Sequence, residues 1–134
     1  MRRMMVGQVI ALVLAAGLVA GCGGSDDESP AIVFDVTANQ LEAMLSDGQP
    51  LVVLDVRTSE EYSATDIPGS VNIPLSELED RLGELSRAVR TVCVCASGVR
   101  SAQAAQLLAA NRFVRLYNLA GGLATWGGPW ESSS

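Results

Sequence analysis

The residues best suited to chemistry lie between a predicted strand and a predicted helix. The apolar run Thr91 to Val94 predicts a buried strand, and the Ala-, Leu- and Gln-rich stretch from Ser101 to about Asn111 predicts a helix. The loop between them begins with a cysteine and ends with an arginine; its residues are Cys95, Ala96, Ser97, Gly98, Val99 and Arg100. A cysteine at such a turn can act as a nucleophile if its thiolate form is favoured.

Three features of this loop favour the thiolate of Cys95. Gly98 permits a positive φ, so the chain can turn tightly. The helix that follows begins with free N–H groups, and successive amides around a sulfur form an anion-binding nest. Arg100 adds a permanent positive charge. Taken alone, the loop also fits a buried structural cysteine followed by an ordinary helix start.

The composition restricts how such a nucleophile can be activated. The 134-residue chain, long enough for one domain, has no histidine, which excludes Ser-His-Asp and Cys-His catalysis and most zinc sites. We therefore expect no metal and no cofactor. Fifteen acidic residues against nine arginines give a net charge of −6, which argues against a nucleic-acid partner.

The other polar and sulfur-bearing residues near the loop have two interpretations each. Cys93 lies two residues before Cys95, on the same strand face and roughly 6–7 Å away, too far for a disulfide without a bend. It is interpreted as a packed core thiol, with a resolving thiol as the alternative. Ser97 and Ser101 can donate hydrogen bonds to the sulfur, or can serve only as turn and cap residues. Trp126 and Trp130 are interpreted mainly as packing residues, with a substrate-facing role as the alternative.

The rest of the folded part alternates between strand and helix patterns. Short apolar runs predict strands, and a capping box at Thr37 and Gln40 predicts a helix to about Leu45. A second helix is predicted from Ser76 to about Leu85, where leucines are spaced by 3, 4 and 3 residues. The predicted strands are Ile32 to Phe34, Leu51 to Leu54, Val71 to Ile73, Thr91 to Val94 and Val114 to Leu119. This alternation predicts an α/β fold with a mostly parallel sheet.

Asp55 and Arg57 directly follow one of the buried strands. Because sites in parallel sheets lie at the carboxyl ends of the strands, we expect both residues on the same rim as Cys95. They are interpreted as supporting residues that brace this rim by a hydrogen bond or an ion pair, with a solvated surface pair as the alternative.

The first thirty residues differ from the rest. Arg2 and Arg3 precede an apolar stretch of about fifteen residues from Val6 to Ala20, the length of a signal-peptide core. Its end, Leu18-Val19-Ala20-Gly21-Cys22, resembles the lipobox of bacterial lipoproteins. The resemblance implies a signal peptide over residues 1–21 and a lipidated Cys22 that anchors an exported protein to a membrane of the cell envelope. Residues 22–31 are interpreted as a flexible acidic tether. An ordinary secretory signal and an uncleaved membrane helix are the alternatives.

From about Ile32 to Trp130 the chain resembles the rhodanese family. The resemblance rests on the Cys95 loop and on three further motifs in the same order. These are Asp55-Val56-Arg57 with Glu60-Glu61-Tyr62, Ile67-Pro68-Gly69-Ser70-Val71-Asn72-Ile73-Pro74, and Asn118-Leu119-Ala120-Gly121-Gly122-Leu123-Ala124-Thr125-Trp126. The resemblance implies a five-stranded sheet with helices on both faces over residues 32–130. The remaining residues, 131–134, are interpreted as a disordered tail.

The same resemblance implies sulfurtransferase activity. Cys95 would take a sulfane sulfur from a small donor such as thiosulfate, hold it as a persulfide, and pass it to cyanide or a thiol. Cys95 and Arg100 enclose four residues, and in the family a loop of this length goes with sulfur transfer, while related phosphatases have one residue more. Many relatives have Gly-His where this chain has Thr65-Asp66, which puts loop packing and pH dependence in question. A catalytically silent docking or sensing module and a thiol redox relay are the alternatives.

Overall fold

The computed structural model describes residues 31–132, so the predicted signal peptide and Cys22 lie outside the described residues. The strands are β1 (Val33–Val36), β2 (Leu51–Asp55), β3 (Val71–Asn72), β4 (Arg90–Val94) and β5 (Leu116–Leu119). The α-helices are α2 (Ala38–Ser46), α3 (Ser59–Ala64), α4 (Leu75–Leu78) and α5 (Val99–Ala110), and the 3₁₀ helices are η2 (Glu79–Glu84) and η3 (Gly122–Thr125).

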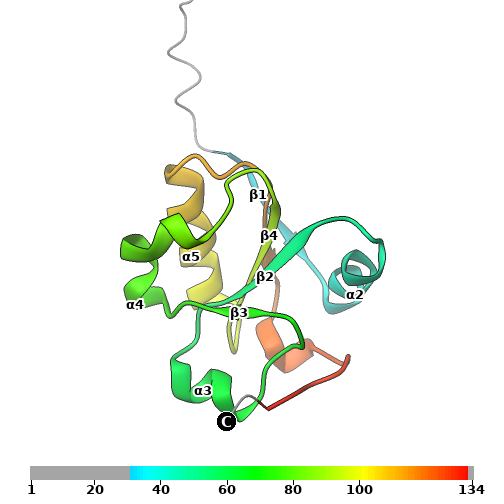
Figure 1. Ribbon diagram of the computed structural model, residues 1–134. Coiled ribbons are helices and arrows are strands. Elements are labelled where there is room, and N and C mark those ends of the chain that lie inside the picture. The colour runs from blue at the N-terminus through cyan, green and yellow to red at the C-terminus, as the bar shows by residue number, and fades with distance from the viewer. Residues whose placement is uncertain (1–30, 133–134) are drawn as a thin grey trace, which may run out of the picture.

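The five strands form one sheet in the order β1-β5-β4-β2-β3, and each pairing between them is parallel. Figure 1 shows α4 and α5 on one face of the sheet and α2 on the other. The predicted α/β fold, with helices on both faces, is therefore confirmed. No helix among the residues that the structure describes is long and apolar enough to cross a bilayer.

The central strands β2 and β4 consist mostly of apolar residues, so both faces of each strand can be buried. Successive residues of β4 alternate between two cores: Cys93 packs with Leu108 and Phe113 under α5, while Val92 and Val94 pack on the α2 side. Because β2 and β4 are adjacent and in register, with Asp55 opposite Val94, the residues that follow both strands emerge at one edge of the sheet.

Helix α2 begins as the sequence predicts. The Thr37 side chain accepts a hydrogen bond from the Gln40 N–H, and the Gln40 side chain accepts one from the Thr37 N–H, which completes the capping box.

The predicted helix from Ser76 to Leu85 is wrong as one continuous helix. The chain forms the single turn α4 and then η2, with a non-helical backbone at Arg81 (φ −120°, ψ 18°). Gly83, a poor helix former, follows the kink. The leucines of the pattern still face the core: Leu78 is buried, and the others are partly buried and pack against the same core.

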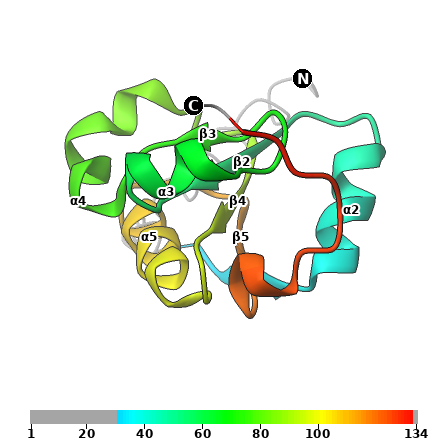
Figure 2. The same cartoon turned by 90° about the horizontal axis from the view of Figure 1, so that it is seen from below.

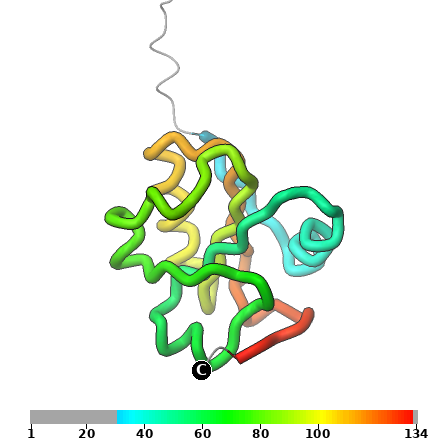
Figure 3. Tube along the Cα trace, in the orientation of Figure 1, coloured from blue at the N-terminus to red at the C-terminus, as the bar shows by residue number. Residues whose placement is uncertain are grey.

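Other boundaries moved by a few residues. The last strand starts at Leu116 rather than Val114, and α5 starts at Val99 rather than Ser101, so the loop after Cys95 is shorter than expected. The C-terminal segment stays paired beyond Trp130: Glu131 and Asp66 exchange two backbone hydrogen bonds of 2.9 and 2.8 Å. Figure 3 shows this segment returning beside the green part of the trace at the lower edge of the molecule.

Candidate active site

The Cys95 sulfur lies in the turn between β4 and α5 and is held by the first residues of the helix. Its Sγ accepts hydrogen bonds from the backbone N–H of Gly98 at 3.1 Å and of Ser101 at 3.2 Å, and lies 3.4 Å from the Ser101 hydroxyl. Cys95 and Ser101 are both fully buried. The loop thus provides the sulfur with the donors that a negative charge requires.

These contacts make Cys95 an unusual thiol. Burial raises its pKa, whereas the N–H groups of Ser101, Ser97 and Gly98 donate hydrogen bonds to the sulfur and lower the pKa; the resulting pKa lies below its ordinary value. A lowered pKa increases the thiolate, which is the nucleophilic form.

The loop keeps its shape because two glycines allow close backbone contacts. Gly98 is the N-cap of α5 with φ +96°, in the left-handed region that favours glycine. Gly122 lies so close to the loop that a Cβ there would stand 2.4 Å from the Ala96 carbonyl oxygen and 2.6 Å from the Ser97 nitrogen.

The turn η3 also bonds directly to the loop. The N–H of Leu123 donates to the Cys95 carbonyl at 2.8 Å, and the N–H of Ala124 donates to the Ala96 carbonyl at 3.2 Å. Figure 2 shows η3, in orange, beside the loop that leads into α5. The segment that forms η3 therefore holds the Cys95 turn from the side opposite to α5.

Asp55 and Arg57 form a buried ion pair at the edge where β2 ends. The guanidinium donates to both carboxylate oxygens at 2.9–3.1 Å, and its Nη2 also donates to the Thr65 carbonyl. The two side chains are 1% and 9% exposed, so this pair is not a solvated surface pair. Asn72 adds to the same edge by donating to the carbonyls of Asp55 and Arg57, each at 3.0 Å.

Arg100 lies in the first turn of α5 and is paired with Glu61 of α3. Its Nη1 and Nη2 donate to the two Glu61 oxygens at 3.0 and 3.3 Å, and both side chains are partly exposed. Hydrogen bonds from Arg100 are the main cause that lowers the pKa of Glu61 to about 2. The same hydrogen bonds to Glu61 are the main cause that raises the pKa of Arg100, and the charge of Cys95 adds a smaller contribution in the same direction.

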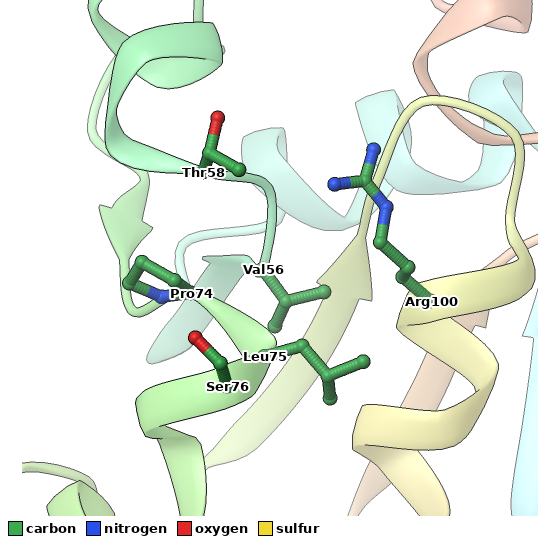
Figure 4. Close-up of a pocket in the computed structure, with 6 residues that line it drawn as sticks. All are labelled: Val56, Thr58, Pro74, Leu75, Ser76 and Arg100. Carbon is green, nitrogen blue, oxygen red and sulfur yellow. The ribbon is translucent and has the colours of Figure 1, made fainter.

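A pocket of about 310 Å³ opens beside Arg100. Figure 4 shows Arg100 on one side of the pocket, facing Thr58 and Pro74, with Val56 and Leu75 between them. The residues that line the pocket are Val56, Thr58, Pro74, Leu75, Ser76 and Arg100. The pocket can therefore receive a small molecule that combines an anionic group with an apolar part.

Cys93, on β4, differs chemically from Cys95, in the turn that follows the strand. Both are free thiols, and Cys93 is fully buried in the core under α5. Burial, together with the nearby Cys95, raises the pKa of Cys93 to about 12. Within residues 31–132, no group of three or more His, Cys, Asp or Glu side chains is arranged to hold a metal ion.

The sequence-predicted site residues thus gather at one edge of the sheet, with different exposures. Arg100 and Gly98 are half-buried, whereas Ala96, Ser97 and Val99 are exposed on the loop. Trp126 is buried and Trp130 is 43% exposed. Two residues that bear on the site were not singled out: Glu61, which pairs with Arg100, and Asn118, which accepts a hydrogen bond from Ser101 at 2.6 Å. The spacing of Thr58 and Glu61 is a capping-box signal that could have located α3 and its carboxylate.

The parallel α/β fold and the buried cysteine of lowered pKa at a strand-to-helix turn define a class of domains that present a thiolate at the carboxyl edge of the sheet. Residues 37–128 match the rhodanese-like domain family, so the chain belongs to that family.

Similar proteins support this assignment. A protein described as a sulfurtransferase from Allochromatium vinosum is 30% identical over 95 residues, which are 71% of this chain and 89% of that protein. YrkF of Bacillus subtilis (strain 168) is 32% identical over 109 residues, 81% of this chain, and the chain spans only 59% of its length. The crystal structure of a rhodanese-like domain protein from Staphylococcus aureus superimposes with a TM-score of 0.70 at 33% identity, covering 75% of this chain and 99% of that one.

Proposed function

We propose that this chain is a sulfurtransferase that carries a sulfane sulfur as a persulfide on Cys95. The observation that carries the proposal is the pair of N–H groups, from Gly98 and Ser101, that donate to the Cys95 sulfur at 3.1 and 3.2 Å. These donors favour the thiolate that attacks, and they need no histidine base.

With thiosulfate as donor, the reaction divides into two substitutions at sulfur. The Cys95 thiolate attacks the sulfane sulfur, the S–S bond of thiosulfate breaks, and its electron pair leaves with sulfite. Cys95 then carries a persulfide anion. In the second step the carbon of cyanide, or a thiolate, attacks the outer sulfur, the persulfide S–S bond breaks, and the electron pair returns to Cys95.

Other features of the site support the same chemistry. Arg100, paired with Glu61, lines the pocket, and the apolar walls of the pocket suit the carbon chain of a small thiol. The likeness to a protein described as a sulfurtransferase points in the same direction.

The test is the intact mass of the purified chain before and after incubation with thiosulfate, polysulfide or a persulfidated thiol. We expect the gain of one sulfur atom, its removal by cyanide, and no gain in Cys95→Ser. Absence of a gain with all three donors would overturn the proposal and favour the silent docking module.

A thiol relay between Cys95 and Cys93 is less consistent with the site. Cys93 is fully buried, and a pKa of about 12 leaves almost none of it as thiolate near neutral pH.

We also propose that the chain is an exported lipoprotein held to a membrane of the cell envelope through Cys22. The support is the sequence pattern of residues 1–22 alone. Metabolic labelling with an alkyne fatty acid tests it: label in the native chain and none in Cys22→Ser is the expected result. Label in both chains or in neither would refute it.

A further inference from the structure

A chain of hydrogen bonds, buried from Cys95 to Asn118, leads from the Cys95 sulfur to the exposed Asp35 on the first strand of the sheet. The Ser101 Oγ lies 3.4 Å from the sulfur and 2.6 Å from Oδ1 of Asn118. Asn118, on β5, is 6% exposed, and its Nδ2 donates to Oδ1 of Asp35 on β1 at 3.3 Å. The same Nδ2 lies 3.5 Å from the Gly98 carbonyl.

The chemistry of the partners fixes the direction of each bond. A carboxylate and a carbonyl only accept hydrogen bonds, so the Asn118 amide must turn its NH₂ toward Asp35 and Gly98. Its oxygen then faces Ser101, and at 2.6 Å the Ser101 hydroxyl must donate to it. A serine hydroxyl has one proton, so it presents only lone pairs to Cys95. In this arrangement the Cys95 S–H donates to Ser101.

This arrangement suits the thiol and opposes the thiolate. When Cys95 loses its proton, the sulfur keeps the N–H donors of Gly98 and Ser101, but it faces the lone pairs of the hydroxyl. The hydroxyl can donate to the sulfur only by turning away from Asn118, which loses a short buried hydrogen bond. We propose that Asn118 is a positioning residue that competes with the Cys95 sulfur for the Ser101 hydroxyl proton and thereby sets the fraction of Cys95 that is thiolate.

Replacing Asn118 removes none of the charged and titratable groups around the sulfur. They come from each neighbouring element: Arg100 of α5 paired with Glu61 of α3, Asp55 paired with Arg57 after β2, Cys93 of β4, and Asp35 of β1 beyond Asn118. A change in the titration of Cys95 on replacing Asn118 would therefore report on the hydroxyl rather than on a lost charge.

The proposal rests on the proposed function only in taking Cys95 as the reacting thiol, and its test does not need sulfur transfer. The readout is the pH dependence of iodoacetamide alkylation of the full chain, followed at the Cys95 peptide by mass spectrometry. In Asn118→Leu the hydroxyl is free to donate to the sulfur. We expect the alkylation midpoint to move to lower pH, with about ten-fold more thiolate at a fixed pH below the midpoint.

Two further variants make the result specific to Ser101. In Ser101→Ala the alkylation midpoint should barely move, because the native hydroxyl gives little net stabilisation to the thiolate. The double variant, with both Ser101→Ala and Asn118→Leu, should have the same midpoint as Ser101→Ala. Asn111→Ala, which removes a side chain that bonds to Leu107 at the end of α5, is the control and should leave the midpoint unchanged.

Three results would overturn the proposal. The first is an alkylation midpoint in Asn118→Leu that is unchanged or higher. The second is a lowering of the midpoint that persists in the double variant, which has no Ser101 hydroxyl. The third is a ten-fold loss of thiolate in Ser101→Ala, since it would show that the hydroxyl already donates to the sulfur in the native protein. If Asn118→Leu does not fold, Ser101→Ala decides alone.

Discussion

Gly122 is the position where the smallest side chain should do the most damage to the reactive turn. An alanine Cβ would stand 2.4 Å from the Ala96 oxygen, 2.6 Å from the Ala96 carbonyl carbon and 2.6 Å from the Ser97 nitrogen. All three atoms belong to the backbone of the loop, so no flexible side chain can move aside. Gly122→Ala therefore tests whether the contact between η3 and the loop shapes the Cys95 site.

The size of the effect follows from these distances. An ordinary contact begins near 3.4 Å, so the Ala96–Ser97 peptide must move by about 1 Å from the 2.4 Å contact. A displacement of about 1 Å at a reacting group can reduce the rate by about 100-fold. In addition, Gly122 has φ +71°, where a residue with a Cβ is less stable by about 1–2 kcal/mol.

The assay is kcat/KM for sulfur transfer from thiosulfate to cyanide, together with the free energy of unfolding in urea. We expect kcat/KM to fall by about 100-fold in protein that is still folded, and stability to fall by at least about 1 kcal/mol. Gly127→Ala is the matched control, because a Cβ at Gly127 meets nothing within 4 Å and its φ is ordinary. A Gly122→Ala variant with kcat/KM close to that of Gly127→Ala would refute the reasoning.

The other predictions concern the ion pairs and the second cysteine. Asp55→Ala leaves the buried Arg57 guanidinium without its carboxylate and should lower the free energy of unfolding by about 3–5 kcal/mol. Glu84→Gln, which removes an exposed ion pair with Arg81, should change it by less than about 1 kcal/mol. Equal effects of the two substitutions would contradict this account. Hydrogen bonds from its arginine partner lower the pKa of Glu61 from 4.5 to about 2, so its contribution to stability is full above pH 4.5 and is lost as the pH falls toward 2. The urea midpoints of the native chain and Glu61→Gln should therefore differ at neutral pH and converge in acid, and a difference that grows in acid would reverse the argument. Cys93→Ala should still load one sulfur atom on Cys95 by intact mass, while loss of loading would revive the thiol relay.

Much of the fold could be predicted because its signals are local. The runs before Asp55 and Cys95 are apolar except for Thr91, which is typical of strands buried on both faces. The Thr37 capping box predicted the start of α2 within one residue. The turn from strand to helix at Cys95 could be predicted for the same reason. The prediction of one helix after Ser76 was wrong because leucine spacing shows only which side chains face the core. Two short helical segments place these leucines toward the core as well as one helix would.

The parts of the site that the sequence did not predict are contacts between distant residues. Glu61 reaches Arg100 across 39 positions, and Asn118 reaches Ser101 across 17. No periodicity relates such pairs, because the fold brings α3 within reach of Arg100 and packs β5 against α5. Gly121-Gly122 was visible as a motif, but its contact with Ala96 needs the position of η3.

The parallel sheet also determines how the domain faces any surface that holds it. All strands enter at one edge, so Ala31, which leads into β1, lies at the opposite edge from Cys95, which follows the end of β4 (Figure 1). If the domain is attached to a surface through residues before Ala31, the edge of the sheet that carries Cys95 points away from that surface, where partners in solution can reach it. A support attached beyond Glu131, which pairs with Asp66 at the reactive edge, would place that edge against the support.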